Sequence, residues 1–217
     1  MISGFSILTL CAAFVFLLAL CMNLVRKNTT LISLYLMQAV TTAVALLALG
    51  ASEHATGLFY AAFLTLAVKA VMAPIFLFRL IRKYSSHFSA ASYLSGPLTL
   101  VLLAIMTGFA YSVSARFAGA GSASQIPLLF AAIFSAFVLM VNRRGALSAV
   151  IGVLALESGV VLLSATLGTA HTFALEFTIA FDIAVWIAIA SAFLGMLYRE
   201  FGMADTDTRL ISTLTEE

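Results

Sequence analysis

The sequence predicts an all-α integral membrane protein with seven transmembrane helices. Hydrophobic residues make up 63% of the 217 residues and charged residues only 9%, whereas soluble domains are about half apolar and a quarter charged. The apolar residues form runs of about 20, the length at which a helix crosses the ~30 Å hydrocarbon layer. The basic residues gather between these runs, as expected for loops at the membrane surface.

Seven apolar runs are expected to cross the membrane, and each is bounded by polar or basic residues. The first run is predicted to be a span and not a secretory signal, because no basic segment precedes it. Pro97 suits the first turn of the fourth helix, since that turn needs no hydrogen bond from its backbone nitrogen. The expected spans are residues 3–25, 29–50, 58–80, 96–116, 126–141, 145–168 and 175–198.

With seven spans, the loops alternate between two sides, and the basic residues fall almost entirely on one of them. Arg116 alone lies on the other side. This distribution places the N-terminus outside and the C-terminus in the cytoplasm. The net charge of +2 is too small to indicate a nucleic-acid partner. The basic residues on the cytoplasmic side are Arg26, Lys27, Arg79, Arg82, Lys83, Arg143, Arg144, Arg199 and Arg209.

The spans also predict two parallel three-helix repeats. Residues 1–83 form the first repeat and residues 117–198 the second. Residues 84–116 supply a linker loop and helix between them, and residues 199–217 form a polar cytoplasmic tail. Because one extra helix separates the two halves, both repeats run in the same direction across the membrane.

Three ionisable residues are expected near mid-membrane depth, where no water holds a charge: Lys69, Glu157 and Asp182. A charge there costs roughly 2.5 to 3.5 kcal/mol on insertion scales, so such residues are rare and usually functional. Desolvation disfavours the charged forms of amines and carboxylates, which makes proton exchange accessible. Pro74 removes a helical hydrogen bond to the carbonyl of Ala70 and is expected to admit water beside the lysine. The three residues are therefore predicted to form a proton relay.

Other polar residues are expected to assist the relay. Gln38 lies at similar depth in the second span, where an amide commonly bonds neighbouring helices together. Ser164 shares a helix face with Glu157, and Thr178 lies one turn before the aspartate. Gly159 lets another helix approach the glutamate closely.

No catalytic residue, metal site or cofactor is expected in this chain. Cys11 and Cys21 are ten residues apart and form no Cys-x-x-Cys pair. The three histidines are expected in loops, with spacings that suit no shared metal site. Any redox chemistry must therefore be carried by another chain.

The order and spacing of these residues resemble the hydrogenase-4 component E family, and each half is similar to the small K subunit of respiratory complex I. The resemblance rests on LYLMQAV around Gln38, AVKAVMAPI around Lys69 and Pro74, LALESG around Glu157, FDIAVW around Asp182, and the polar tail. In the first half, a glutamine and a lysine stand where the K subunit has glutamates.

The resemblance implies a non-catalytic membrane subunit of a complex I-related nickel-iron hydrogenase or formate hydrogenlyase complex. Its expected partners are larger antiporter-like membrane subunits and a metal-bearing hydrophilic arm, in the inner (cytoplasmic) membrane of a prokaryote. Its expected role is to conduct or couple protons. Three alternatives stay open: a stand-alone solute carrier with a three-plus-one-plus-three helix layout, a subunit of a multisubunit cation/proton antiporter, and a structural scaffold.

Overall fold

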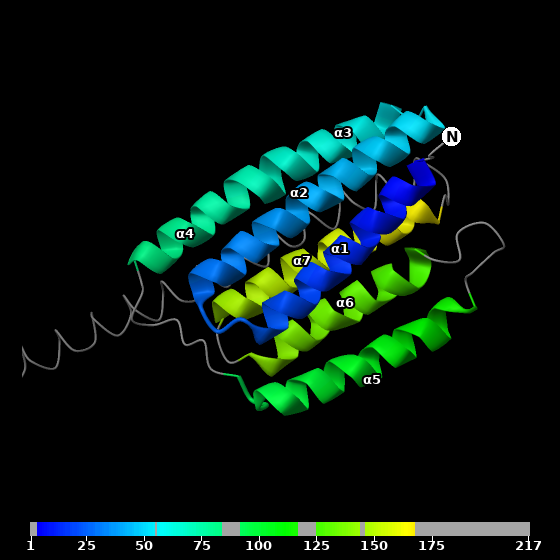
Figure 1. The fold of residues 1–217 in the computed structure, drawn as a ribbon. Helices are drawn as coiled ribbons and strands as arrows, with labels where there is room; N and C mark the ends of the chain where they lie inside the picture. The colour runs from blue at the N-terminus through cyan, green and yellow to red at the C-terminus, as the bar shows by residue number, and fades with distance from the viewer. Residues whose placement is uncertain (1–3, 55, 84–91, 117–124, 144–145, 168–217) are drawn as a thin grey trace, which may run out of the picture. The chain divides into compact units, whose positions relative to one another are not determined.

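Long apolar helices run side by side in the computed structural model, which describes residues 4–54, 56–83, 92–116, 125–143 and 146–167. Three consecutive elements, α3, η1 and α4, follow one another without a break and form one rod (Figure 1). The helices in chain order are α1 (Gly4–Leu24), α2 (Asn28–Glu53), α3 (Thr56–Thr65), the π-helix η1 (Leu66–Met72), α4 (Ala73–Lys83), α5 (Gly96–Ser114), α6 (Gln125–Asn142) and α7 (Ala146–Thr166).

The described part of the chain contains six helices long and apolar enough to cross a membrane. The third of them combines α3, η1 and most of α4. Within the described ranges there is no β-strand, only an isolated antiparallel bridge between Ser92 and Arg143. The prediction of an all-helical, multi-pass membrane protein is therefore confirmed for the part of the chain that the structure describes. The seventh expected span, residues 175–198, lies outside the described residues and stays a prediction.

Local sequence signals explain where the helices begin and end. In the hydrocarbon layer each backbone N–H and C=O must be bonded within the chain, so apolar runs become helices. Pro97 occupies the first turn of α5, where its missing N–H is not needed. Helix α2 ends at Glu53 and is capped by His54, which adopts a left-handed conformation (φ 52°) and donates its N–H to the carbonyl of Gly50.

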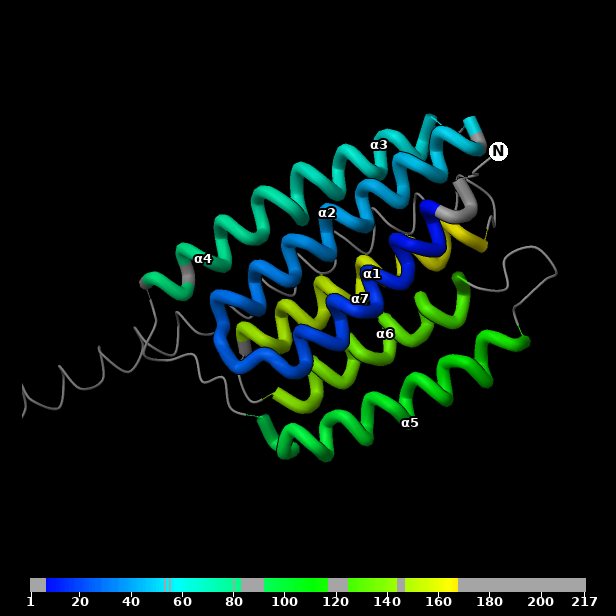
Figure 2. Tube along the Cα trace, viewed as in Figure 1, coloured from blue at the N-terminus to red at the C-terminus, as the bar shows by residue number. Residues whose placement is uncertain are grey.

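Four helices form the centre of the described bundle: α1, α2, α6 and α7. Helix α1 packs against α2 and α6, and α7 packs against α6 and α2. Figure 2 shows that α1 and α6 run in one direction, and that α2 and α7 run in the opposite direction. The rod of α3, η1 and α4 covers α2, and α5 packs mainly on α6. Buried residues at the centre include Leu8, Val15, Ala19, Leu46, Leu129, Ala132, Val161 and Leu162.

Two glycines allow α6 and α7 to approach closely. A Cβ atom on Gly159 would lie 2.8 Å from Cγ1 of Ile133, and one on Gly152 would lie 3.1 Å from Cα of Met140. Small residues at helix contacts let backbones approach in membranes, where lipid chains are as apolar as the helix surface. The close approach predicted at Gly159 is therefore present, and α6 is the helix that makes it.

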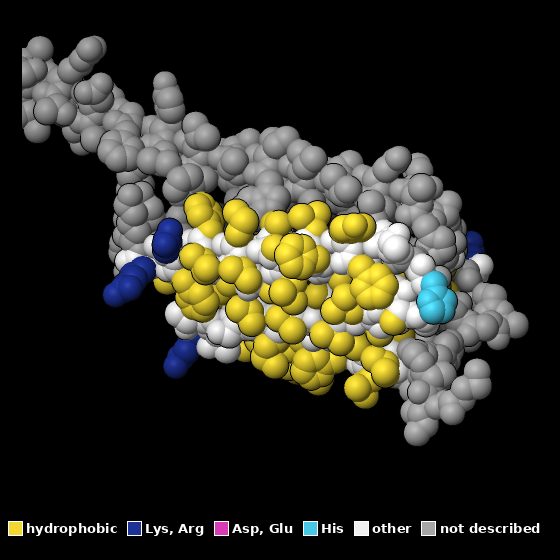
Figure 3. Space-filling view, turned by 90° about the horizontal axis from the view of Figure 1, so that it is seen from above, with side chains coloured by type: hydrophobic (Ala, Val, Ile, Leu, Met, Phe, Trp, Pro, Cys, Tyr) yellow, Lys and Arg dark blue, Asp and Glu magenta, His cyan; other side chains and the backbone are white. Residues whose placement is uncertain are grey.

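The loops at one end of the bundle carry most of the basic residues of the described chain. Helices α1, α4 and α6 end there, and α2, α5 and α7 begin there. The surface between the two ends is apolar on the face that Figure 3 shows, with Lys and Arg side chains toward the ends. This end carries Arg26, Lys27, Arg79, Arg82, Lys83 and Arg143, whereas Arg116 follows the opposite end of α5.

Candidate functional site

An ion pair joins two membrane spans inside the bundle. The ammonium nitrogen Nζ of Lys69 lies 2.6 Å from Oε1 of Glu157, and the two side chains are 2% and 0% exposed. Glu157 lies ten residues after Leu147, the start of its span, which is about 15 Å along the helix. Two of the three residues predicted for the relay therefore meet directly, each near the middle of its candidate span.

Lys69 occupies the centre of the π-helix η1. The backbone N–H of Ala73 donates to the carbonyl of Val68, five residues earlier, where an α-helix would bond four residues apart. The π-helix ends at Met72, so the buried Pro74 falls in the first turn of α4. Such π turns inside helices are frequent at functional sites. The sequence predicted a local disturbance here from Pro74, and the structure shows a π-helix.

Gln38 lies on α2 and is 0% exposed. Its Nε2 donates a hydrogen bond of 3.4 Å to the carbonyl of Ala155, two residues before Glu157 on α7. The hydroxyl of Thr42, also 0% exposed, donates to the carbonyl of Gln38 over 3.0 Å. The amide therefore bonds α2 to α7 two residues before Glu157, which is the interhelical contact expected for it.

The electrostatics of the pair explain how both charges can be buried. Each charge alone would lose its hydration, but the ammonium and the carboxylate compensate each other at hydrogen-bond distance. Addition of a proton to Glu157, or loss of one from Lys69, would remove this compensation. The charge of each member is therefore balanced by the other, and each depends on its partner to remain charged in the bundle. No group of three or more metal-ligating residues occurs among the residues that the structure describes.

The other predicted site residues are not part of this pair. The hydroxyl of Ser164 donates to the carbonyl of Val161 in its own helix over 2.9 Å. Thr178 and Asp182 lie outside the described residues, so their place in the relay stays a prediction. The structure thus brings together Lys69, Glu157 and, through Ala155, Gln38.

Arg143 has a structural role that sequence reasoning missed, because it was counted only as an orientation signal. Its side chain is 5% exposed, and Nη2 donates to the carbonyls of Met22 (3.1 Å), Asn23 (3.2 Å) and Val25. The last carbonyls of a helix have no partner within it, so the guanidinium binds the end of α1. Burial, and to a lesser extent the positive charge of Arg26, lower the pKa of Arg143.

A signal for Arg143 was present in the sequence. Ala132, Ala136 and Leu139 are buried, and Arg143 follows at the same three- and four-residue spacing. That spacing places all four residues on one helix face. Asn142, the residue before Arg143, donates from Nδ2 to the hydroxyl of Thr99 on α5 over 3.0 Å. The basic end of α6 is therefore bonded to both α1 and α5.

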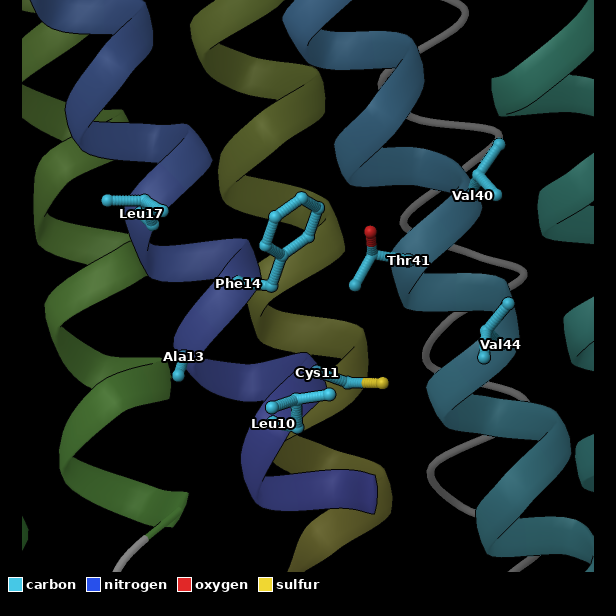
Figure 4. A pocket seen from close by; sticks show the side chains of 8 residues that line it. All are labelled: Leu10, Cys11, Ala13, Phe14, Leu17, Val40, Thr41 and Val44. Atoms are coloured by element: carbon cyan, nitrogen blue, oxygen red, sulfur yellow. The ribbon is translucent and has the colours of Figure 1, made fainter. Parts of the chain in front are cut away.

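An apolar groove of about 510 Å³ lies between α1 and α2. Figure 4 shows α1 and α2 supplying its two walls. The lining residues are Leu10, Cys11, Ala13, Phe14 and Leu17 on α1, and Val40, Thr41 and Val44 on α2. Leu10 is 72% exposed and Leu17 is 52% exposed, so the groove opens on the outside of the bundle. Neither member of the ion pair lines it, and it is not part of the candidate site.

Comparisons with known protein families, curated proteins and solved structures found no match to this chain. The resemblance to the hydrogenase-4 component E family therefore stays a hypothesis that rests on the residues themselves.

Proposed function

We propose that this chain is a non-catalytic membrane subunit of a complex I-related, redox-driven complex of the hydrogenase or formate hydrogenlyase type, and that Lys69 and Glu157 form part of its proton relay. The observation that carries the proposal is the ion pair itself. Two opposite charges lie 2.6 Å apart and almost fully buried, each in the middle of a membrane span. Ionisable residues at this depth mark proton and ion pathways in membrane proteins.

A purely structural role explains the pair poorly. Two apolar side chains of similar volume hold helices together as well as a buried ion pair, and often better. The attraction between the two charges therefore does not stabilise the fold more than apolar side chains would, once the cost of removing the charges from water is included. Titration is a property that apolar residues lack, so a function that needs proton transfer accounts for the presence of both charges.

The energy for proton movement would arrive from neighbouring subunits. A change of charge close to the bundle would alter the proton affinities of Lys69 and Glu157 and shift their protonation. In this proposal Asp182 extends the relay in the seventh predicted span. Metal sites in other chains would perform the redox reaction, and this chain would couple it to the protons.

The arrangement of the helices supports the proposed pair of parallel repeats. Three residues separate α1 from α2, and three separate α6 from α7, and both turns are basic. The first helices of the two repeats, α1 and α6, pack on each other, as do the second helices, α2 and α7. A rotation axis along the helices would relate the pairs in this way.

The partners of the chain distinguish this function from its alternatives. After gentle solubilisation, we expect the chain to purify with antiporter-like subunits and with hydrophilic subunits that bind metal. A multisubunit antiporter would yield the membrane subunits without a metal-bearing arm. Purification of the chain alone, with transport of a solute, would instead establish a stand-alone carrier.

The relay itself is tested with the variant Glu157→Gln in the intact complex. Glutamine keeps the size of glutamate and an acceptor for the Lys69 ammonium, but it does not titrate in this range. We expect normal assembly and loss of proton pumping, measured in vesicles and normalised to the amount of assembled enzyme. The matched control is Ser148→Ala, which changes another buried polar residue of α7.

Wild-type turnover and a wild-type proton gradient in Glu157→Gln would show that Glu157 only bonds the helices. An equal loss of pumping in Ser148→Ala would assign the effect to packing of α7. Either result would refute the relay.

A further inference from the structure

The amide of Gln38 has a defined orientation in its contact with α7, two residues before Glu157. The carbonyl of Ala155 can only accept a hydrogen bond, so the group that faces it at 3.4 Å must be the Nε2 donor. This contact directs Oε1 of the same amide away from that carbonyl. Oε1 is buried and has no hydrogen-bond partner within the described part of the chain.

A buried acceptor without a partner costs free energy, and such a group in a native structure requires an explanation. Helix α2 packs against both η1 and α7, the two elements that carry Lys69 and Glu157. The carbonyl that holds the amide is only two residues from Glu157 in sequence. The unpartnered acceptor therefore lies on the helix that packs against both elements of the ion pair.

Proton uptake by Glu157 removes the anionic partner of the Lys69 ammonium. One proton from outside the pair bonds to the carboxylate, which becomes a neutral acid, while Lys69 keeps its three N–H bonds and its charge. The ammonium then lacks the anion that compensated its burial, and other acceptors must stabilise it. An amide oxygen is a strong neutral acceptor for an ammonium donor.

We propose that Gln38 is a positioning residue of the pair, whose Oε1 accepts a hydrogen bond from the Lys69 ammonium when Glu157 is protonated. The proposal rests on the relay function and adds the group that stabilises its second protonation state. Glu157 would alternate between an ion-paired carboxylate and a neutral acid. The amide oxygen of Gln38 would stabilise the Lys69 ammonium while Glu157 is a neutral acid, so no other carboxylate would be needed for this purpose.

The other titratable groups on the packed elements are few among the described residues. Tyr35 is the nearest in sequence: it is 0% exposed and three residues before Gln38 on α2. Helix α6 has none, and α7 has only Glu157. The others are Cys11 and Cys21 on α1, Glu53 at the end of α2, Tyr60 on α3, and Arg79, Arg82 and Lys83 on α4.

The test follows the protonation of Glu157 by infrared difference spectroscopy of the complete chain in lipid vesicles. The carbonyl band of the neutral acid is recorded against pH and assigned by its loss in Glu157→Gln. In Gln38→Met, which keeps an unbranched side chain of similar length, we expect the midpoint of proton uptake to move at least one unit lower in pH. That shift is a tenfold loss of proton affinity. Gln38→Asn, which keeps the amide, should recover part of it.

Tyr35→Phe is the matched control, and its midpoint should equal that of the wild type. An unchanged midpoint in Gln38→Met would overturn the proposal, as would an equal shift in Tyr35→Phe or the absence of a band from Glu157. The titration is independent of proton pumping. A shifted midpoint together with normal pumping in Glu157→Gln would support the role of Gln38 and refute the relay.

Discussion

Lys69 and Glu157 are held together by two different backbone geometries. Nζ of Lys69 comes from the centre of a π-helix, and Oε1 of Glu157, 2.6 Å away, comes from an α-helix. A π turn changes the direction in which the following side chains leave the helix, because it adds a residue to the turn. The local winding of η1 therefore determines where the ammonium lies.

The energetic coupling of the pair can be measured with apolar replacements. Lys69→Met or Glu157→Met alone leaves one charge buried without its partner and should lower the free energy of unfolding by about 3–5 kcal/mol. The double variant removes both charges and should recover most of this loss. Thermal unfolding in detergent provides the measurement. If the effects of the two single variants simply add in the double variant, the two groups are not coupled.

The contact between α6 and α7 is sensitive to a single methyl group. A Cβ on Gly152 would lie 3.1 Å from the backbone of Met140, which cannot move without shifting α6. Gly152→Ala should therefore lower the free energy of unfolding by about 1–3 kcal/mol. Gly108 on α5 has open space around it, so Gly108→Ala should be neutral or stabilise by up to about 1 kcal/mol. Equal effects of the two variants in a thermal unfolding assay would contradict the close approach.

Arg143 should contribute more to the free energy of unfolding than the other basic residues at the same end of the bundle. Arg143→Gln removes charged hydrogen bonds to the last carbonyls of α1 and should cost on the order of 3 kcal/mol. Arg143→Lys should recover only part, because an ammonium lacks the planar set of donors. Arg82 is exposed, and Arg82→Gln should change stability by no more than about 0.5 kcal/mol. Chemical unfolding of the three variants would be compared, and a loss in Arg82→Gln as large as that in Arg143→Gln would refute the role of Arg143.

The orientation of the chain is tested by labelling from one side of the membrane. Lys27 follows α1 at the basic end, and His54 follows α2 at the opposite end. In a background without Cys11 and Cys21, we expect a membrane-impermeant thiol reagent to label His54→Cys from outside intact cells. Lys27→Cys should react only after the cells are opened. Labelling of both positions from the same side would contradict the alternation of the spans.

The sequence by itself determined the class of the protein and the limits of most helices. The fifth span was expected at residues 126–141, and the helix runs from Gln125 to Asn142; the sixth was expected at 145–168, and its helix runs from Ala146 to Thr166. These limits are local properties. In lipid, an apolar run must bond its own backbone and become a helix, and it ends where polar residues reach the surface.

The sequence also predicted a similar depth for Lys69 and Glu157, because depth follows from distance along a span. Only the tertiary structure decided that these two residues meet and that Gln38 bonds to α7 two residues from Glu157. It also decided that Arg143 turns inward while Arg26 stays exposed. Such contacts depend on which helix faces which neighbour and on how each helix is rotated about its axis. Packing of all the helices together sets both, and no single run of residues contains that information.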